Sequence, residues 1–233
     1  MMVFCGGMIR SGSTWQYQVA AHLLEHQGLG RRWAYSEPAK LEAVLADTPP
    51  ERLHGVVKSH PVVPSIARLL QERRANALYC YRDLRDVAAS AMRVFARGWS
   101  HDRILAMLQE AVTHETHWRS HPGTLVQRYE DLTADAAGAV EQIANHLEIP
   151  LVCGEARQIA AVYSPDQQVQ RIRKWLDSNP NGRFDPDSML YPNHLAAHNV
   201  EDRAPRLSPE WDRKIADRLP NWFMLHGYRI HFV

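Results

Sequence analysis

Short apolar segments alternate with amphipathic segments along most of the chain, and this alternation predicts the fold. The apolar segments are typical of buried parallel strands, and they cover residues 2–9, 53–58, 77–81 and 124–129. Apolar residues at helical spacing predict helices over residues 15–25, 65–74, 86–97, 100–118 and 133–147. We therefore predict an α/β fold in which a parallel β-sheet is flanked by helices in a three-layer architecture.

Beyond about residue 150 the pattern changes. Helical spacing predicts helices over residues 155–162 and 209–219, and the segments between them are irregular and rich in Pro, Asn and Asp. The sequence contains no internal repeat, no interdomain linker and no further segment with a strand pattern. We therefore predict a single domain over residues 1–233.

Charge narrows the classes of partner. The chain has 27 Lys and Arg residues against 26 Asp and Glu residues, which gives a formal net charge of +1. A protein that coats nucleic acid normally has a clear basic excess, so we expect no nucleic-acid partner. Lysine occurs only at positions 40, 58, 174 and 214. Arginine, which suits bidentate binding of phosphate and sulfate oxygens, supplies the remaining positive charge.

Cysteine usage and the N-terminal segment bear on the compartment. Cys5, Cys80 and Cys153 are far apart and odd in number, which argues against a disulfide framework or a zinc site. The apolar segment at residues 1–9 is too short for a signal sequence or a membrane span. We expect a cytoplasmic protein without stable membrane insertion.

Cationic side chains stand at the ends of three of the four predicted strands. Arg10 follows the first strand, Lys58 and His60 lie at the end of the second, and Arg82 follows the third. The carboxyl ends of parallel strands meet at one edge of the sheet, where α/β proteins bind their ligands. We therefore expect these side chains to surround one anion-binding site.

The loop after the first strand nearly fits a phosphate-binding loop. Gly7 and Gly12 are separated by four residues, and Ser13 stands where a phosphate-binding loop has its lysine. The backbone N–H groups of such a loop still point at an anion beside a helix N-terminus. A simple glycine turn between a strand and a helix explains the same residues, and this alternative stays open.

Taken together, the motifs resemble those of sulfotransferases that use 3′-phosphoadenosine 5′-phosphosulfate (PAPS). The family's 5′-phosphosulfate loop, PKSGTTW, is similar to residues 9–15, IRSGSTW, and its K-[ST]-H segment to residues 58–60, KSH. Its 3′-phosphate motif, R-[ND]-P-[KR]-D-V-x-x-S, resembles residues 82–90, RDLRDVAAS, and its YEDL strand end matches residues 129–132. The four motifs occur in the family's order over residues 1 to about 135, which makes the resemblance specific.

The resemblance implies a reaction. A sulfuryl group passes from PAPS to a hydroxyl of a small-molecule acceptor by in-line displacement, 3′-phosphoadenosine 5′-phosphate (PAP) is the product, and no metal is required. His60 corresponds to the general base, and Arg10 and Lys58 to the cations beside the leaving oxygen. The chemistry favours these roles independently, because histidine titrates near the working pH and a fixed cation stabilises developing negative charge.

The resemblance also implies a nucleotide site, with a nucleotide-binding core over residues 1–135 and acceptor-side and C-terminal elements over residues 150–233. The 5′-phosphate falls to the loop after the first strand, the 3′-phosphate to Arg82 and Ser90, and adenine to the rings of Trp15 and Tyr129. The residues implied for the nucleotide are Arg10, Ser11, Gly12, Ser13, Thr14, Trp15, Arg82, Ser90 and Tyr129.

The sequence departs from the family pattern in three places. Ile9 and Leu84 replace prolines of the first loop and of the 3′-phosphate motif, and the family's C-terminal loop rich in arginine and glycine is not recognisable. We therefore predict that Arg203 or Arg206 completes the 3′-phosphate site. Residues 94–99 and 164–198 are the segments predicted to line the acceptor site, while the acceptor and the oligomeric state stay open.

Two other functions fit parts of the pattern. A P-loop kinase or another nucleotide phosphotransferase would share the first loop, but it normally keeps the lysine that Ser13 replaces. A catalytically decayed nucleotide-binding module that regulates a partner would not need a base at position 60. The His22/His26 and His114/His117 pairs lack the third ligand of known zinc motifs, so we predict no metal site.

Overall fold

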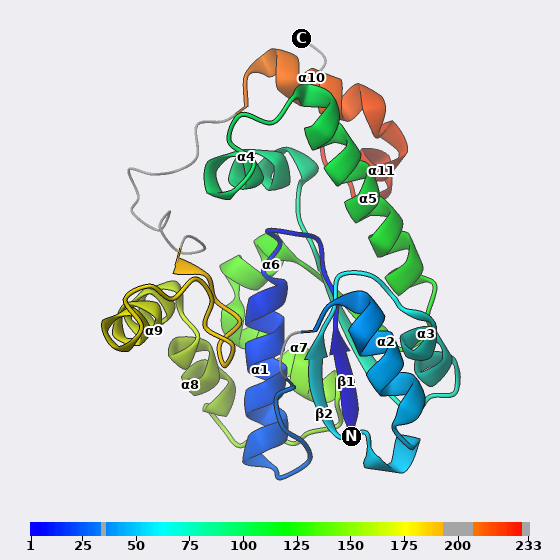
Figure 1. Ribbon diagram of the computed structural model, residues 1–233, viewed down its shortest axis with the longest axis vertical. Coiled ribbons are helices and arrows are strands. Elements are labelled where there is room, and N and C mark those ends of the chain that lie inside the picture. Colours follow the sequence, from blue (N-terminus) through cyan, green and yellow to red (C-terminus); the bar gives the residue numbers. More distant parts are fainter. Residues whose placement is uncertain (34–35, 193–206, 230–233) are drawn as a thin grey trace.

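A four-stranded parallel sheet forms the centre of the molecule in the computed structural model (Figure 1). The structure describes residues 1–33, 36–192 and 207–229. The strands are β1 (Met2–Cys5), β2 (Gly55–Lys58), β3 (Asn76–Tyr81) and β4 (Thr124–Arg128), in the spatial order β2-β1-β3-β4. Phe4 of β1 is aligned with Val57 on one side and with Ala77 on the other. The predicted α/β class and parallel sheet are confirmed.

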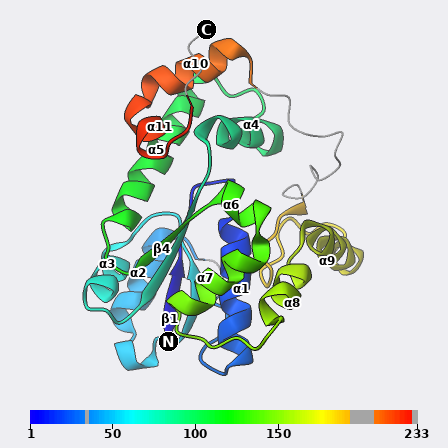
Figure 2. The ribbon, with the colours of Figure 1, turned by 180° about the vertical axis from the view of Figure 1, so that it is seen from behind.

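Helices cover both faces of the sheet. One face is covered by α1 (Ser13–His26), α7 (Ala136–His146) and α8 (Glu155–Val162), as the view from behind shows (Figure 2). The opposite face is covered by α2 (Pro38–Asp47), α3 (Pro64–Gln71) and α5 (His101–Arg119). A 3₁₀ turn (Pro50–Arg52) leads into β2. These layers form the predicted three-layer architecture.

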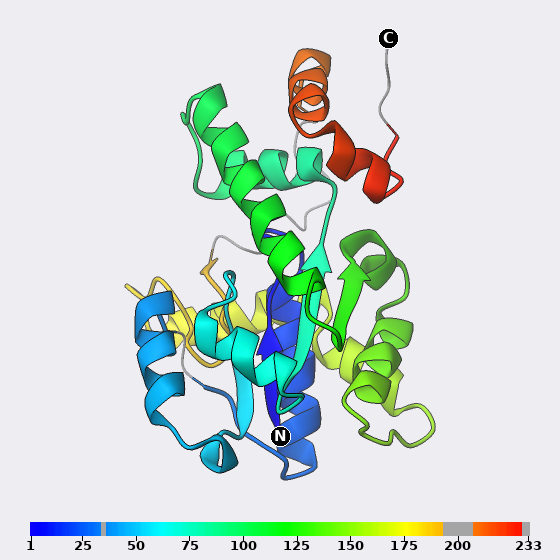
Figure 3. The same ribbon diagram turned by 90° about the vertical axis from the view of Figure 1, so that its right-hand side faces the viewer.

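The remaining helices lie beyond the carboxyl end of the sheet or beside it. Figure 3 shows α4 (Leu84–Val94), α10 (Pro209–Arg218) and α11 (Pro220–Leu225) gathered with α5 beyond the strand ends. The short α6 (Tyr129–Ala134) follows β4 directly, and α9 (Pro165–Ser178) follows α8. This arrangement places helices around the edge at which parallel strands present their ligand-binding loops.

Alternate residues of each strand enter two separate apolar cores, as the period of two requires. Met2 and Phe4 pack with α2, α3 and α5, whereas Val3 and Cys5 pack with α1, α7 and α8. Because both faces of β1, β2 and β3 are buried, these strands are largely apolar, and this is why the sequence showed continuous apolar segments where an exposed sheet would alternate.

Several predicted element boundaries are wrong, each for a local reason. The helix predicted over residues 133–147 is broken at Asp135, whose carboxylate accepts from Gly138 N at 2.9 Å and begins α7. The helix predicted over 209–219 ends before Pro220, and α11 begins there. The helices α2, α9 and α11 were not predicted, although each begins with proline, and α6 covers residues 129–132, which were not predicted to be helical. No described helix is long and apolar enough to cross a membrane.

Trp118 of α5 is fully buried and lies against the first loop. Its indole Nε1 donates to the carbonyl of His60 at 2.8 Å. Gly6, at the end of β1, approaches the ring so closely that a Cβ there would stand 2.5 Å from Trp118 Cε2. The glycine is therefore required by close packing, and the packing joins the first loop to the segment that contains His60.

We expect Gly6→Ala to lower the free energy of unfolding by about 1–3 kcal/mol, because the added methyl group overlaps the indole in a filled core. Urea unfolding of Gly6→Ala, Trp118→Phe and the double variant gives the loss in free energy of unfolding for each, and comparing the losses tests whether the overlap is the cause. If the overlap is responsible, the double variant should lose less than the sum of the single losses, by about 1 kcal/mol. Additive losses would show that Gly6 does not act through Trp118.

Candidate functional site

A cavity of about 1490 Å³ lies at the carboxyl end of the sheet. The β1–α1 loop, the end of β2, α4 and α6 form one part of its wall, and residues from α8 to Tyr191 form another. Its volume exceeds the range of about 300–1,000 Å³ that is usual for one small ligand, so two molecules have room in it. The predicted residues that line it are Arg10, Gly12, Ser13, Thr14, Trp15, Lys58, His60, Arg82, Ser90 and Tyr129.

The β1–α1 loop turns sharply at two glycines. Gly12 caps α1 with a φ of 90°, in the left-handed region that favours glycine, and a Cβ at Gly7 would stand 2.5 Å from the Cβ of Ser13. The loop thus folds back on the start of α1. The N–H groups in the first turn of a helix have no partner within the helix, and Ser13 and Thr14 of this turn line the cavity.

Ser11 lies under this loop and does not line the cavity. Its fully buried hydroxyl lies 2.7 Å from both Met8 O and Cys80 O. The side chain therefore holds the loop against β3. A role for Ser11 in binding phosphate through its hydroxyl stays a prediction, and the observed geometry gives the hydroxyl a supporting function.

Lys58 reaches from β2 to the start of α1. Its Nζ donates to the Thr14 hydroxyl. Burial of the ammonium group lowers the pKa of Lys58 to about 8, and the charge of Arg10 contributes to the same shift. The group remains charged at neutral pH, and its surroundings favour an added negative charge.

His60 is anchored through one ring nitrogen. Its Nδ1 lies 2.8 Å from Gly7 O, and because a carbonyl only accepts, Nδ1 must carry the proton of the neutral ring. Nε2 therefore keeps the lone pair. Burial, followed by the charge of Lys58, lowers the pKa of His60 to about 4, so the imidazole is neutral at pH 7. A neutral histidine with a free Nε2 is suited to accept a proton.

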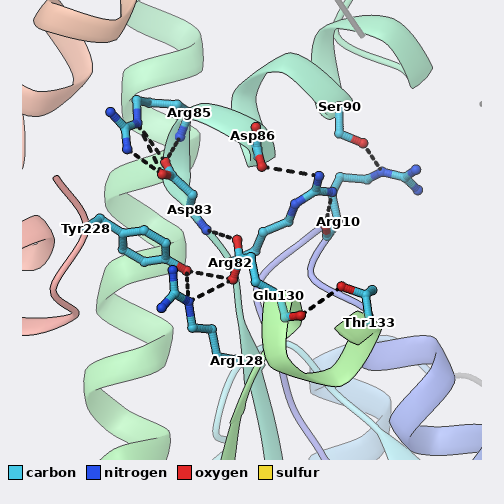
Figure 4. Close-up of polar contacts among 10 residues, drawn as sticks. All are labelled: Arg10, Arg82, Asp83, Arg85, Asp86, Ser90, Arg128, Glu130, Thr133 and Tyr228. Carbon is cyan, nitrogen blue, oxygen red and sulfur yellow. Dashed lines mark hydrogen bonds and ion pairs between the residues drawn. The ribbon is translucent and has the colours of Figure 1, made fainter. Parts of the chain in front are cut away.

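Two arginines and a serine meet on the opposite side of the loop (Figure 4). Arg10 Nε donates to Ser90 Oγ of α4 at 2.9 Å. The guanidinium of Arg82 lies 4.2 Å from the centre of the Tyr129 ring, and its Nη1 lies 3.4 Å from Arg10 O. Burial and the charges of Arg93 and Arg82 lower the pKa of Arg10 to about 10. Arg10 stays charged at neutral pH, and a bound anion would relieve the repulsion.

Residues outside the implied set also line the cavity, among them Arg93 and several aromatic side chains. Arg93 stands three residues after Ser90, so both lie on one face of α4, a spacing that the sequence already contained. Phe184 and Tyr191, whose ring centroids are 4.7 Å apart, line the cavity within the segment predicted for the acceptor. Phe95 lies in the other predicted acceptor segment and also lines it.

Two further predictions concern the completion of the 3′-phosphate site and the absence of a metal site. Arg203 and Arg206, predicted to complete the 3′-phosphate site, lie outside the described residues. In the part of the chain that the structure describes, no three His, Cys, Asp or Glu side chains gather in a way that could hold a metal ion.

The parallel α/β sheet, the glycine turn at a helix start and the cationic side chains around it form a site suited to an anionic ligand at the carboxyl end of the strands. The family model described as "Sulfotransferase domain" matches residues 2–174. The chain belongs to this family, whose activity is sulfuryl transfer, and the resemblance seen in the four motifs is confirmed. No curated protein matches the chain by sequence.

Solved structures share the fold. Retinol dehydratase in a complex with retinol and PAP has a TM-score of 0.66 at 17% identity, covering 100% of this chain and 83% of that one. Retinol dehydratase in complex with androsterone and inactive cofactor PAP has a TM-score of 0.64 at 18% identity, covering 99% and 82%. Mouse sulfotransferase SULT7A1 complexed with PAP has a TM-score of 0.64 at 16% identity, covering 95% and 83%.

We expect Lys58→Met to raise the free energy of unfolding at pH 7 by about 1 kcal/mol, because methionine avoids the cost of burying an ammonium group and loses only one hydrogen bond. The pKa of Lys58 falls from 10.5 to about 8 on folding, so the unfolded chain holds this proton more tightly. The wild type therefore gains stability as the pH rises from about 8 towards 10.5, and the advantage of the variant should shrink over this range. Urea unfolding of the wild type and of Lys58→Met at pH 7 and pH 10 measures the difference in their free energies of unfolding. A variant that is less stable than the wild type at pH 7 would contradict the expectation.

Proposed function

We propose that this protein transfers the sulfuryl group of PAPS to a hydroxyl of a small-molecule acceptor, with His60 as the general base. One observation carries the proposal. His60 is held by Gly7 O beside the glycine turn, with its pKa lowered, so that a neutral ring borders the cavity that Lys58 and the α1 N-terminus also border. A binding module needs the cations but not the neutral histidine.

The two sides of the β1–α1 loop suit the two ends of the donor. Gly12, Ser13 and Thr14 at the start of α1 suit the 5′-phosphosulfate, because backbone N–H groups and the helix N-terminus favour an anion. The 3′-phosphate would lie at Arg82 and Ser90. The retinol dehydratase and SULT7A1 structures that share this fold are complexes with PAP, which supports the same nucleotide here.

The proposed step balances as an in-line displacement. The acceptor hydroxyl passes its proton to Nε2 of His60, its oxygen forms a bond to sulfur, and the bond between sulfur and the bridging oxygen breaks. Negative charge collects on the 5′-phosphate of PAP, where Lys58 stabilises it. Arg10 lies at Ser90, so we assign it first to the nucleotide phosphates; its role at the leaving oxygen stays a prediction.

The acceptor would occupy the part of the cavity beside Phe95, Phe184 and Tyr191. These rings suit an apolar or amphipathic alcohol. Two of the structures that share the fold are complexes of retinol dehydratase, one with retinol and one with androsterone, which agrees with this class of acceptor.

The choice of donor separates this proposal from a kinase. A kinase needs Mg²⁺ to neutralise the β- and γ-phosphates of ATP, whereas side chains and loop N–H groups suffice for a phosphosulfate. We expect PAP in EDTA to raise the melting temperature, because a ligand that binds only the native state stabilises it. ATP with Mg²⁺ at the same concentration should give little shift. Strong stabilisation by ATP–Mg²⁺ and none by PAP would replace the sulfotransferase proposal with the kinase.

The second test concerns the base. His60→Ala should reduce kcat by about a hundredfold or more, while PAP binding measured by calorimetry changes little. Because a base works unprotonated and the pKa of His60 is about 4, kcat/KM of the wild type should be level between about pH 5 and pH 7 and fall towards pH 4. It should also fall above about pH 8, where Lys58 loses its proton. A His60→Ala variant that keeps most of its activity would remove His60 from this role, whereas an acid limb near pH 6.5 in the wild type would contradict only the lowered pKa.

A further inference from the structure

The carboxylate of Glu130 joins three segments behind the cavity (Figure 4). Its Oε1 accepts from the backbone N–H of Asp83, in the β3–α4 turn, at 3.3 Å. Its Oε2 accepts from Arg128 Nε at 3.0 Å and from the hydroxyl of Tyr228 at 2.9 Å. Glu130 thus connects the end of β4, the start of α4 and the C-terminal segment.

Tyr228 is itself fixed in place. Its ring stacks on Trp222 of α11, with an interplanar angle of 12° and centroids 5.2 Å apart, and the Arg128 guanidinium lies 4.3 Å from its centre. Burial, followed by the charge of the Glu130 carboxylate, raises the pKa of Tyr228, so its hydroxyl keeps its proton and remains a donor. The C-terminal segment therefore offers a rigid hydroxyl to Glu130.

A second contact binds the same turn to the C-terminal segment. Arg85 forms a close ion pair with Asp83, the residue that caps α4, and its Nη1 donates to Arg229 O at 3.1 Å. Arg85 also lies 5.1 Å from the centre of the Phe223 ring. The start of α4 is thus connected to residues 223–229 directly through Arg85 and indirectly through Glu130.

Asp83 and Glu130 each follow a residue of the proposed nucleotide site in the sequence. Arg82 precedes Asp83 and Tyr129 precedes Glu130, so the link between Asp83 and Glu130 sets the distance between Arg82 and Tyr129. Asp83 also begins the helix that carries Ser90. Glu130 and Tyr228 do not line the cavity, so they act on it through Arg82 and α4.

We propose that Glu130 and Tyr228 are positioning residues for the 3′-phosphate end of the nucleotide site, with the C-terminal segment as their support. This inference rests on the proposed function. It assigns to Tyr228, whose side chain lies behind the site, a role in reading the 3′-phosphate. The measurable consequence is a change in discrimination between PAP and 5′-AMP, which differ only in the 3′-phosphate.

The test is calorimetric titration of the full chain with PAP and with 5′-AMP. Arg82→Ala, which removes a direct charged contact, should weaken PAP about tenfold or more. Tyr228→Phe keeps the stacked ring and removes only the hydroxyl, and it should weaken PAP about fivefold, with a change of less than about twofold for 5′-AMP. The ratio of the two affinities is the readout, because a general loss of stability would not change it selectively.

Tyr17→Phe is the matched control. Tyr17, like Tyr228, is a buried tyrosine, and its hydroxyl donates to Trp33 O at 3.2 Å; Tyr17 does not line the cavity and has no hydrogen bond with Glu130. This variant should lower the melting temperature but leave the ratio of PAP to 5′-AMP affinity unchanged. An equal fall of the ratio in Tyr17→Phe would mean that loss of a buried hydroxyl suffices, and would overturn the proposal.

A second series tests whether Tyr228 acts through Glu130. Glu130→Ala should lower the ratio of PAP to 5′-AMP affinity at least as much as Tyr228→Phe does, and Glu130→Gln should lower it less. The ratio in the double variant Tyr228→Phe/Glu130→Ala should be no lower than in Glu130→Ala alone. Additive losses would overturn the shared path. If Glu130→Ala does not fold, Tyr228→Phe and Glu130→Gln decide the question.

Failure of the proposed function and failure of the positioning role would give different results in these titrations. A wild type that binds PAP no more tightly than 5′-AMP would overturn the proposed function itself. A wild type that prefers PAP, together with a Tyr228→Phe variant that keeps the full preference, would overturn the positioning role and leave the proposed function intact.

Discussion

The hydrogen bond between the His60 ring and Gly7 O is the interaction on which the site depends. It joins the ends of two neighbouring strands, sets the tautomer of the imidazole and leaves Nε2 available. Trp118 holds the same segment from α5 through the His60 carbonyl, and the glycine at position 6 admits its ring. The geometry of the proposed base is therefore built into the centre of the fold and not into a surface loop.

Charge is concentrated around this centre although the chain as a whole is nearly neutral. Burial lowers the pKa values of Lys58, His60 and Arg10 together, so each cation is held at a cost and the histidine is kept uncharged. An anion that enters the cavity reduces the repulsion between these groups. The same arrangement separates the roles of neighbouring residues: Lys58 stays charged at neutral pH, while His60, two positions along the chain, does not.

The C-terminal segment reaches the same site from the opposite side. Arg128, Glu130 and Tyr228 connect it to the turn that carries Arg82. The family's C-terminal loop rich in arginine and glycine is not recognisable in this sequence. The contacts are made by a tyrosine hydroxyl and a carboxylate that stand behind the cavity. In the proposed positioning role, these residues would support the 3′ side of the site indirectly, through the position of α4.

The sequence by itself determined the parallel sheet, because strands buried on both faces must be apolar throughout, and it determined which loops carry charge, because those loops directly follow the strands. It also contained the spacing that places Arg93 beside Ser90. It did not separate Ser11, whose hydroxyl lies under the loop, from its neighbours that line the cavity. Only the tertiary structure decided that, and it alone brought Tyr228 to Glu130, because contacts between residues 98 positions apart depend on how whole elements pack and leave no local pattern.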